Sequence, residues 1–350
     1  MSFFGVTAEE IKQVGPIDGA DRIEVASLAG MDYSFVVGKG QFKAGDKVLY
    51  FPVDSIIPID VTRKMGLEGK LSGKNKDRVK TIKLRGQISQ GIVAVLDLVP
   101  AHIMEQGPEA ITDCLGVKKY DPPEVPCHNA ILKGLPDGVP VYDIESADRY
   151  VEVAARLMEQ DVMVSEKVEG SNFSVLVTAS GEVMVNQHNY TIIPKEGAEH
   201  TFWKVAQEQG IIDFAKSVSS ADSTKRDVVV YGEMLGPGIQ KNIYKLAKHK
   251  VLLFDVMANR QWLDPEKFIF AVQGFFGDLT ASVPILGDVG GPLSRWLGGK
   301  TIKEASNGKS CLADVLREGI VIKPMKEQTD QKLGRLFLKQ RSPEYLAKEE

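Results

Sequence analysis

The stretch Val164-Ser-Glu-Lys167-Val-Glu-Gly170-Ser-Asn-Phe-Ser-Val175 places one lysine where an apolar, strand-like run meets a glycine turn. Valines and small residues on both sides predict a strand, a turn and a second strand, and Gly170 lets backbone approach a ligand closely. A lysine ordinarily keeps its proton up to a pKa of about 10.4, so nucleophilic use requires burial or neighbouring cations. The stretch therefore predicts a lysine nucleophile, provided that the rest of the chain supplies its partners.

The pattern Lys-x-x-Gly alone does not single out Lys167. It also occurs as Lys70-Leu-Ser-Gly73 and Lys83-Leu-Arg-Gly86, so at least two of the three matches are ordinary loop or turn sequence. Charged residues mostly lie exposed, and a solvated lysine beside a turn explains Lys167 equally well when it is taken alone. Residues further along the chain have to decide between the two interpretations.

The composition of the 350-residue chain is that of a soluble globular protein, with 43% hydrophobic and 26% charged residues. This length suits about two domains. No apolar run approaches the roughly 20 residues that span a bilayer, and the first residues lack a secretory signal, so we expect a cytoplasmic protein with no membrane association. The three cysteines are scattered without a Cys-x-x-Cys pair, which argues against a disulfide framework or a zinc ribbon.

The net charge is −4, so the protein as a whole does not attract polyanions, and any nucleic-acid surface must be local. One segment, from Lys74 to Arg85, holds six basic residues and one acidic residue within twelve positions. Part of it alternates, which predicts cations on one strand face. The candidate nucleic-acid contacts are Arg78, Lys80, Lys83 and Arg85. The alternative is a solvated sheet edge, since lysines also protect edges from aggregation.

Residues 1–110 consist of short apolar runs separated by glycine turns, among them 34–38, 47–53 and 79–84. Short strands at such close intervals predict a small closed or nearly closed barrel, and an OB-fold, which binds oligonucleotides, is the natural candidate. Residues 111–145 are rich in proline and glycine, which interrupt helix and strand periodicity. We expect an ordered connector there.

Residues 146–350 are predicted to form a second domain. Its expected elements are, in order, a helix over 147–160, the lysine strand and turn, strands over 173–177 and 183–188 in a meander, a helix over 201–218, and helical stretches within 264–275 and 301–317. The fold class is therefore α+β, with antiparallel sheets and flanking helices.

A lysine that attacks the α-phosphate of a nucleotide requires a metal held by carboxylates, cations around the phosphates, and an apolar or aromatic slot for the base. Glu318 and Glu169 are candidates for holding Mg²⁺, which prefers oxygen ligands. The candidate cations are Lys323, Lys339 and Arg341. Their charge would favour the neutral, nucleophilic form of Lys167. Phe254 is the candidate for stacking on a base.

Five short motifs follow one another in an order that resembles the covalent nucleotidyltransferase superfamily of ligases and capping enzymes. They are Glu166-Lys-Val-Glu-Gly-Ser-Asn-Phe-Ser174, Tyr231-Gly-Glu233, Leu253-Phe-Asp-Val256, Glu318-Gly-Ile-Val-Ile-Lys323 and Leu338-Lys-Gln-Arg-Ser342. Within it, Lys-Val-Glu-Gly-Ser-Asn followed by Gly-Pro-Gly-Ile-Gln-Lys-Asn resembles the ATP-dependent RNA ligases. An OB-like domain in front, with the chain ending soon after the last motif, is similar to the RNA ligase 5 family.

The resemblance implies an OB-like β-barrel followed by an ATP-grasp-like, ligase-type nucleotidyltransferase domain, with ATP and Mg²⁺ as cofactors and Mn²⁺ as a substitute. It implies that Lys167 accepts AMP, that Lys339, Arg341 and Lys323 act on phosphates, that Glu318 and Glu169 bind metal, and that Glu166, Gly170, Asn172, Glu233 and Phe254 bind the nucleotide. The chain departs from its relatives at Gln187-His188-Asn189, where an arginine beside an asparagine is common.

The principal hypothesis is an ATP-dependent RNA ligase that joins 3′-OH and 5′-phosphate ends through lysyl-AMP and adenylylated RNA. Separate ends and a nicked duplex both stay open as substrates, and no obligate protein partner is expected. DNA ligases and RNA-capping guanylyltransferases use the same lysine chemistry, but they usually place the OB domain after the nucleotidyltransferase domain. A non-catalytic nucleic-acid-binding relative is disfavoured because Lys167, Glu233, Glu318 and Lys339 occur together in a compatible order.

Overall fold

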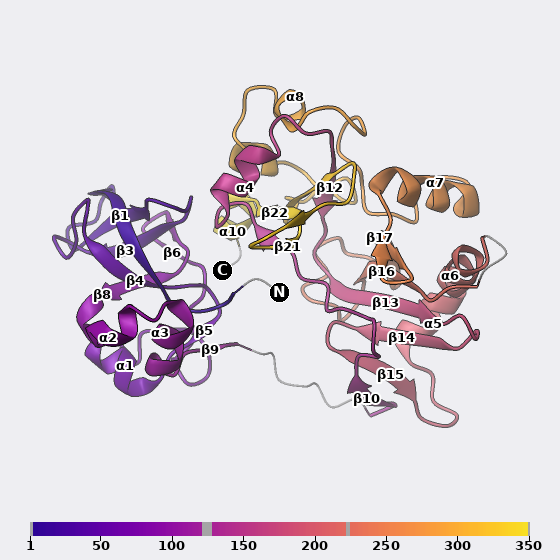
Figure 1. Ribbon diagram of the computed structural model, residues 1–350, viewed down its shortest axis with the longest axis horizontal. Coiled ribbons are helices and arrows are strands. Elements are labelled where there is room, and N and C mark those ends of the chain that lie inside the picture. Colours follow the sequence, from indigo (N-terminus) through magenta and orange to yellow (C-terminus); the bar gives the residue numbers. More distant parts are fainter. Residues whose placement is uncertain (1–2, 121–127, 222–224, 349–350) are drawn as a thin grey trace. The chain divides into compact units, whose positions relative to one another are not determined.

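The computed structural model describes residues 3–120, 128–221 and 225–348, and these divide into two units (Figure 1). The first unit comprises the described residues up to 120, together with Ala147–Val153 and the segment that begins at Leu346. The second comprises the remainder up to Tyr345. Of the predicted connector, residues 121–127 lie outside the described residues, and the rest contains the end of a helix, two strands and the first residue of a third strand.

The first unit is built on a five-stranded antiparallel sheet with the order β3-β2-β1-β4-β8. Its strands are β1 (Thr7–Pro16), β2 (Ile23–Leu28), β3 (Ser34–Gly38), β4 (Lys47–Phe51) and β8 (Ile92–Val95). The first part of β1 pairs with β4 and the rest with β2, and an irregularity between Ile11 and Gln13 separates the two parts. Because a bulge bends a strand and increases its twist, one sheet curls into a half-barrel.

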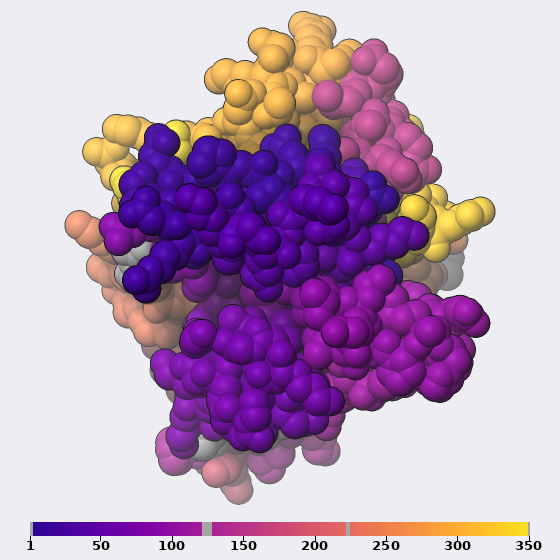
Figure 2. Space-filling view, turned by 90° about the vertical axis from the view of Figure 1, so that its left-hand side faces the viewer, coloured from indigo at the N-terminus to yellow at the C-terminus, as the bar shows by residue number. Residues whose placement is uncertain are grey.

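The curled sheet has apolar side chains on both faces, as β4 shows. Leu49 and Phe51 pack in one buried cluster, while Val48 and Tyr50 pack in another, because successive side chains of a strand point to opposite faces. The helices α1 (Ile59–Lys64), α2 (Ala101–Met104) and α3 (Pro108–Leu115) contribute to the Leu49 cluster. Figure 2 presents the surface of this unit, in indigo to purple, to the viewer.

Two small ladders complete the first unit. They are β5 (Ser55–Ile56) with β9 (Lys118–Lys119), and the hairpin of β6 (Ile82–Leu84) with β7 (Gln87–Ser89). The strand predicted over 79–84 is wrong in its extent. Val79 is buried, and its N–H donates to the carbonyl of Ser55 at 2.9 Å, so the chain is tied to the β5 segment before β6 begins.

The second unit contains a seven-stranded sheet with the order β10-β15-β14-β13-β16-β17-β18, and every neighbouring pair is antiparallel. Its strands are β10 (Ala130–Gly134), β13 (Ser171–Val177), β14 (Val183–Gln187), β15 (Tyr190–Pro194), β16 (Val228–Leu235), β17 (Lys250–Ala258) and β18 (Gln261–Trp262). The β13–β14 pair confirms the meander predicted from the sequence.

A second sheet in this unit has the order β11-β22-β19-β12. Its strands are β11 (Glu145–Ser146), β12 (Val162–Lys167), β19 (Gly319–Pro324) and β22 (Leu338–Arg341). The lysine stretch therefore supplies β12 to the smaller sheet and β13 to the larger one, and the turn at Gly170 joins them. Leu176 and Tyr231 of the larger sheet share a buried cluster with Val321 and Phe337, so the two sheets pack against each other.

Helices α5 (Thr201–Glu208), α6 (Ile211–Ser219) and α7 (Pro265–Phe276) cover the other face of the larger sheet (Figure 1). Phe202, Phe214 and Phe268 of these helices pack with Phe173 and Val175 of β13. The helix predicted over 201–218 is wrong in being continuous. Gly210 adopts a φ of 67°, which begins α6 as a separate helix with a new direction.

The remaining elements are α4 (Val151–Arg156), α8 (Leu293–Leu297), α9 (Ile302–Ser306), α10 (Pro343–Lys348) and the short pair β20 (Thr329–Asp330) with β21 (Gly334–Arg335). α7 and α9 confirm the helical stretches predicted within 264–275 and 301–317. The helix predicted over 147–160 is shorter than expected. The carbonyls of Met158 and Gln160 accept from the N–H groups of Ser294 and Leu293, so tertiary partners replace helical ones. Within the described part of the chain, no helix is both long and apolar enough to cross a membrane.

Candidate active site

A cavity of about 210 Å³ lies in the second unit, next to the turn that joins the two sheets. Its walls come from β12 and β13 on either side of that turn and from β16, β17, β19 and β22. Of the predicted site residues, it brings together Glu166, Lys167, Asn172, Glu233, Phe254, Lys323 and Lys339. Positions far apart in the sequence meet here because their strands belong to two sheets that pack face to face.

Lys167 forms an ion pair with Glu318. The lysine ends β12, and the antiparallel register sets it opposite Gly319, the first residue of β19. Its Nζ donates to Oε2 of Glu318 at 2.7 Å. The two side chains are 23% and 11% exposed, so water screens this pair less than it screens a surface salt bridge.

Two glycines allow this packing. A Cβ on Gly319 would lie 2.1 Å from the carbonyl oxygen of Gln340, so only glycine lets β22 approach β19 here. A Cβ on Gly170 would lie 2.5 Å from the carbonyl oxygen of Met234. Gly170 is not among the residues that line the cavity, and the close approach it permits is to β16, the strand that carries Glu233.

Glu233 and Lys339 on the cavity wall titrate near neutral pH. Burial raises the pKa of Glu233 to about 8, and the positive charge of Lys167 offsets only part of that rise. Burial also lowers the pKa of Lys339 to about 8, and the charge of Lys167 lowers it further. Surroundings of low dielectric disfavour the charged form of both groups. Such shifts in a cavity are typical of functional sites.

Glu166 presents an unusual carboxylate to the cavity. The residue is 1% exposed, and its Oε2 accepts from the N–H of Cys311 at 2.8 Å. Its Oε1 is buried without a hydrogen-bond partner among the described residues. A buried acceptor in that state is costly unless a ligand supplies a donor.

An aromatic cluster forms the wall around Phe254. Its ring centroid lies 4.7 Å from that of Tyr142, which in turn packs on Tyr231 at 5.1 Å and on Trp262 at 5.5 Å. Phe254 and Tyr142 both line the cavity. The tilted and edge-on rings of this cluster pack around Phe254, which offers an apolar aromatic surface to a planar base.

Lys323 lines the cavity but is bound to a partner that the sequence analysis did not name. Its Nζ donates to Oδ2 of Asp255 at 2.6 Å, and both side chains are almost fully buried. Tyr142 and Arg335 donate to the same oxygen, each at 2.6 Å. Burial alone would raise the pKa of Asp255, but Lys323 and Arg335 outweigh it and hold the pKa below its ordinary value. Lys323 thus completes a buried network directly behind Phe254.

Glu169 and Arg341 lie beside the Lys167–Glu318 pair. Glu169 accepts from the N–H of Lys241 at 3.2 Å and from the hydroxyl of Tyr345, and it does not line the cavity. Nε of Arg341 lies 3.4 Å from Oε1 of Glu318. Glu318 therefore has a cation on each of its two oxygens.

The donor set fits Mg²⁺ bound through its substrate. Among the residues that the structure describes, no three or more His, Cys, Asp or Glu side chains cluster to hold a metal ion. Mg²⁺ usually keeps several waters and binds through one or two carboxylates together with substrate phosphates. The carboxylate of Glu318, next to the nucleophile candidate, suits that arrangement, whereas Glu169 is engaged by Tyr345 and Lys241.

His188 and Asp143 were missed by the sequence analysis as site residues. Both line the cavity, with Nε2 of His188 3.8 Å from Oδ1 of Asp143. His188 follows β14, where the sequence departs from the arginine common among relatives, so the departure was the available signal. Asp143 lies in the Pro/Gly-rich segment, and nothing in its local sequence indicated a place at the site.

The predicted nucleic-acid contacts belong to the first unit and differ in their surroundings. Nη2 of Arg78 lies 2.6 Å from Oδ1 of Asp54, and its guanidinium lies 3.4 Å from the ring centre of Tyr120. Lys80, Lys83 and Arg85 are exposed. The structure thus brings Arg78 into an internal contact and leaves the other three on the surface.

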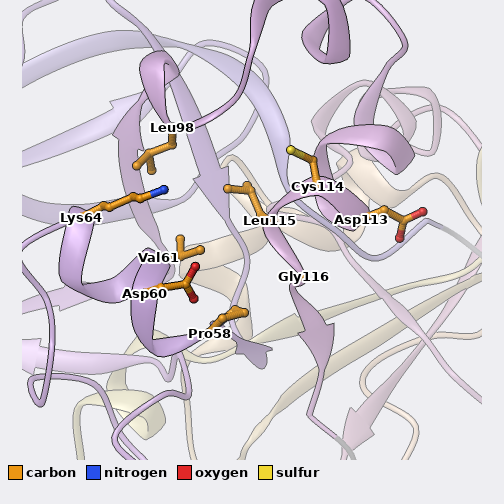
Figure 3. A pocket seen from close by; sticks show the side chains of 9 residues that line it. All are labelled: Pro58, Asp60, Val61, Lys64, Leu98, Asp113, Cys114, Leu115 and Gly116. Atoms are coloured by element: carbon orange, nitrogen blue, oxygen red, sulfur yellow. The ribbon is translucent and has the colours of Figure 1, made fainter.

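Figure 3 shows a hollow of about 270 Å³ in the first unit. Its lining residues are Pro58, Asp60, Val61, Lys64, Leu98, Asp113, Cys114, Leu115 and Gly116. Cys114 has no histidine among these neighbours to activate it, and the carboxylate of Asp113 points away from Lys64 (Figure 3). The Lys167–Glu318 pair lies instead beside the cavity of the second unit.

Two packed sheets that meet at a lysine-bearing turn, with a carboxylate paired to that lysine, define a ligase-type nucleotidyltransferase domain. A family model described as RNA ligase matches residues 160–340, and a model described as an OB-fold domain matches residues 5–96. The first match spans more than half of the chain, so the chain belongs to the RNA ligase family. The expected order of an OB-fold followed by a ligase domain is confirmed.

Solved structures of Naegleria gruberi RNA ligase are similar over almost the whole chain. They include one variant with ATP and Mn (TM-score 0.79), another with AMP and Mn (0.78) and the ligase with PPi (0.78), each at 26% identity and each covering 98% of both chains. No match was found among curated proteins.

Proposed function

We propose that this protein is an ATP-dependent RNA ligase that joins a 3′-OH end to a 5′-phosphate end. The observation that carries the proposal is the placement of Lys167, paired with Glu318, on a cavity wall that also bears Lys339 and an aromatic surface. Membership of the RNA ligase family and the ATP, AMP and PPi named with similar structures support it.

The chemistry consists of three transfers at phosphorus. Nζ of Lys167, after losing a proton, attacks the α-phosphorus of ATP; a P–N bond forms, the bond to the β-phosphate breaks, and pyrophosphate leaves. An oxygen of the RNA 5′-phosphate then attacks the same phosphorus, which breaks the P–N bond and returns the lysine. Finally the 3′-OH attacks the activated 5′-phosphate, a phosphodiester forms, and AMP leaves.

The residues of this cavity are assigned to the parts of that reaction. Lys339, in its charged form, holds the α-phosphate, and Phe254 stacks on the adenine. Glu233 and Asn172 bind the ribose side of the nucleotide. Arg341 keeps Glu318 in place. A bound Mg²⁺, or Mn²⁺ in its place, would neutralise charge on the phosphates, with Glu318 as its protein ligand.

The two units have different tasks in this proposal. Residues 1–110 hold the RNA, residues 146–350 carry out adenylyl transfer, and residues 111–145 connect them. The OB-fold match over residues 5–96 supports the first assignment because OB-folds bind single-stranded nucleic acid through a charged groove. Separate RNA ends and a nicked duplex both stay open as substrates in this assignment.

Transfer of label from nucleotide to protein tests the proposal. The full-length protein, incubated with Mg²⁺ and α-labelled ATP, should retain acid-resistant label that RNA with a 5′-phosphate then removes. Lys167→Ala should retain none while keeping its RNA affinity. Label from GTP alone would instead indicate a capping guanylyltransferase, joining of DNA ends alone would indicate a DNA ligase, and no label from either nucleotide would leave a non-catalytic nucleic-acid-binding relative.

A further inference from the structure

The β6–β7 hairpin of the first unit exposes cations and aliphatic side chains together. Every residue of β6 is exposed, with Ile82 at 42% and Leu84 at 39%. The turn residues Arg85 and Gly86 have φ values of 50° and 83°, as a two-residue turn between the paired Leu84 and Gln87 requires. Two large aliphatic side chains on one short strand are a cost in water that a partner would remove.

The hairpin is anchored at its inner strand. The backbone N–H of Val36 donates to Oγ of Ser89 at 3.0 Å, and the hydroxyl of Ser34 donates to the carbonyl of Ile88 at 3.1 Å. Nε2 of Gln87 donates to the same Ser34 hydroxyl at 3.1 Å. These contacts fix β7 beside β3, so β6 is the outer strand of a firmly held projection.

The cations of this outer strand are not neutralised within the described part of the unit. Lys80, Lys83 and Arg85 form no salt bridge with a described residue, and Nζ of Lys83 has one contact, 3.5 Å from the carbonyl of Ala347. Arg78, by contrast, is paired with Asp54 and stacked on Tyr120. In a chain of net charge −4, this concentration of free positive charge fits a polyanion.

The side chains also indicate how a polyanion would be held. Residues 74–89 include no Phe, Tyr or Trp, so the hairpin offers no platform for stacking on bases. Ile82 and Leu84 point to one face of β6 and Lys83 to the other, so a sugar–phosphate backbone along the open edge of the strand can meet the aliphatic side chains with the C–H faces of its riboses and the cations with its phosphates. The surface of two aliphatic side chains is far smaller than the roughly 800 Å² per partner that a stable protein interface buries, so the hairpin suits an RNA backbone better than a protein partner.

We propose that β6 is the element that grips the RNA backbone, with Lys80, Lys83 and Arg85 contacting phosphates while Ile82 and Leu84 pack against riboses. The inference rests on the proposed function, since it states how the first unit holds the RNA. It adds two uncharged contact residues, Ile82 and Leu84, to the expected cations. It leaves out Arg78, because Asp54 and Tyr120 engage that side chain within the fold.

Salt titration separates the two kinds of contact. The affinity of the full-length protein is measured with a fluorescein-labelled RNA bearing 3′-OH and 5′-phosphate ends, as a single strand and as a nicked duplex, over a range of salt. The triple variant Lys80→Ala/Lys83→Ala/Arg85→Ala should lower the slope of log affinity against log salt by roughly 2 on the single strand and by roughly 3 on the duplex, from three lost phosphate contacts. The double variant Ile82→Ser/Leu84→Ser should weaken binding about tenfold at every salt concentration with the slope unchanged.

Matched controls come from the same unit. Ile59 is 62% exposed and Lys39 is exposed, and neither belongs to the hairpin. Ile59→Ser and Lys39→Ala should leave affinity and slope unchanged. All variants should form lysyl-AMP at the rate of the unmodified protein and should have the same melting temperature. If a multiple variant does not fold, Lys83→Ala and Leu84→Ser are used singly with the same expectations.

Several results would overturn the inference. If Ile82→Ser/Leu84→Ser lowers the RNA affinity no more than Ile59→Ser does, Ile82 and Leu84 do not contact the RNA. If the triple variant keeps the salt slope of the unmodified protein, Lys80, Lys83 and Arg85 do not contact phosphates. A parallel loss of lysyl-AMP would assign the hairpin to another step or to a protein contact. Each of these leaves the ligase assignment intact if the unmodified protein joins RNA; failure of the unmodified protein to bind either RNA overturns both.

Discussion

Nζ of Lys167 and Oε2 of Glu318 lie 2.7 Å apart, across the register that pairs β12 with β19. In an ion pair the lysine is an ammonium group, which has no lone pair with which to attack phosphorus. Adenylyl transfer therefore requires Nζ to lose a proton and to turn from Glu318 toward the phosphate. Arg341 on the other oxygen of Glu318 gives the carboxylate a second partner when it does.

Glu318→Gln tests whether the charge of this carboxylate serves chemistry or only packing. Lysyl-AMP formation should fall by about a hundredfold or more, because charge beside the reacting centre is lost while the shape is kept. The melting temperature should fall only modestly, because the neutral amide still accepts from Lys167 and the pair is partly exposed, so the change costs less than the roughly 3–5 kcal/mol of a broken, fully buried pair. The two readouts are label transfer from ATP and thermal unfolding; full activity in the variant would make Glu318 a structural residue.

The pKa of Lys339, lowered to about 8, predicts an alkaline limit on the first step. Below that pH the side chain is charged and holds the α-phosphate; above it the charge is lost, so lysyl-AMP formation should decline as pH rises through about 8. Lys339→Arg stays charged and should remove this decline while lowering the rate, because the guanidinium has a different geometry. Initial rates of label transfer across the pH range measure it, and a decline that persists in Lys339→Arg would assign the limit to another group.

Glu166 should govern affinity for the base rather than stability. Its Oε1 is buried without a partner among the described residues, so Glu166→Ala should leave the free energy of unfolding unchanged or increase it. The same variant should raise the KM for ATP by about tenfold, the value of one lost hydrogen bond to a charged group. Urea unfolding and ATP titration of lysyl-AMP formation are measured side by side. A large loss of stability with an unchanged KM would make Glu166 a support for the Cys311 loop only.

Asp255 should be the most sensitive member of the network behind Phe254. Asp255→Ala leaves Lys323 buried without an anion and leaves Arg335 with Glu327 alone, and breaking such a buried pair costs about 3–5 kcal/mol. Lys323→Met should cost less, because Arg335 still pairs with Asp255 at 2.6 Å. Urea unfolding ranks the two variants. If Lys323→Met costs more than Asp255→Ala, Arg335 alone does not neutralise the buried carboxylate of Asp255.

Gly319 and Gly274 form a matched pair for the effect of a single methyl group. Gly319→Ala introduces a Cβ 2.1 Å from the carbonyl oxygen of Gln340, so it should separate β19 from β22, destabilise the fold by about 3 kcal/mol or more, and reduce lysyl-AMP formation. Gly274 lies within α7 with open space around it, and Gly274→Ala should stabilise by about 0.5–1 kcal/mol without changing activity. Equal stabilities would mean that the β19–β22 contact relaxes freely.

The order of the motifs in the sequence identified most of the residues of the candidate site. Lys167, Glu233, Phe254 and Lys339 were identified from short motifs, and all four line one cavity. Each of these motifs lies on a strand or turn that its local residue pattern identifies. The order of the motifs follows the order of these elements along the chain. The helix predicted over 201–218 shows the corresponding weakness: its apolar period continues through Gly210, where the backbone turns away.

The amino-acid sequence by itself determined the strand–turn–strand around Lys167, the α+β class and the family resemblance, because these depend on periodicity and on residues close together in the chain. Only the tertiary structure decided the partners of its charges. It pairs Lys167 with Glu318, Lys323 with Asp255 and Arg78 with Asp54, and it ties Glu169 to Tyr345. Except for Arg78–Asp54, these pairs are more than 60 residues apart in the sequence, and their members meet through strand register and sheet packing, which no local pattern encodes.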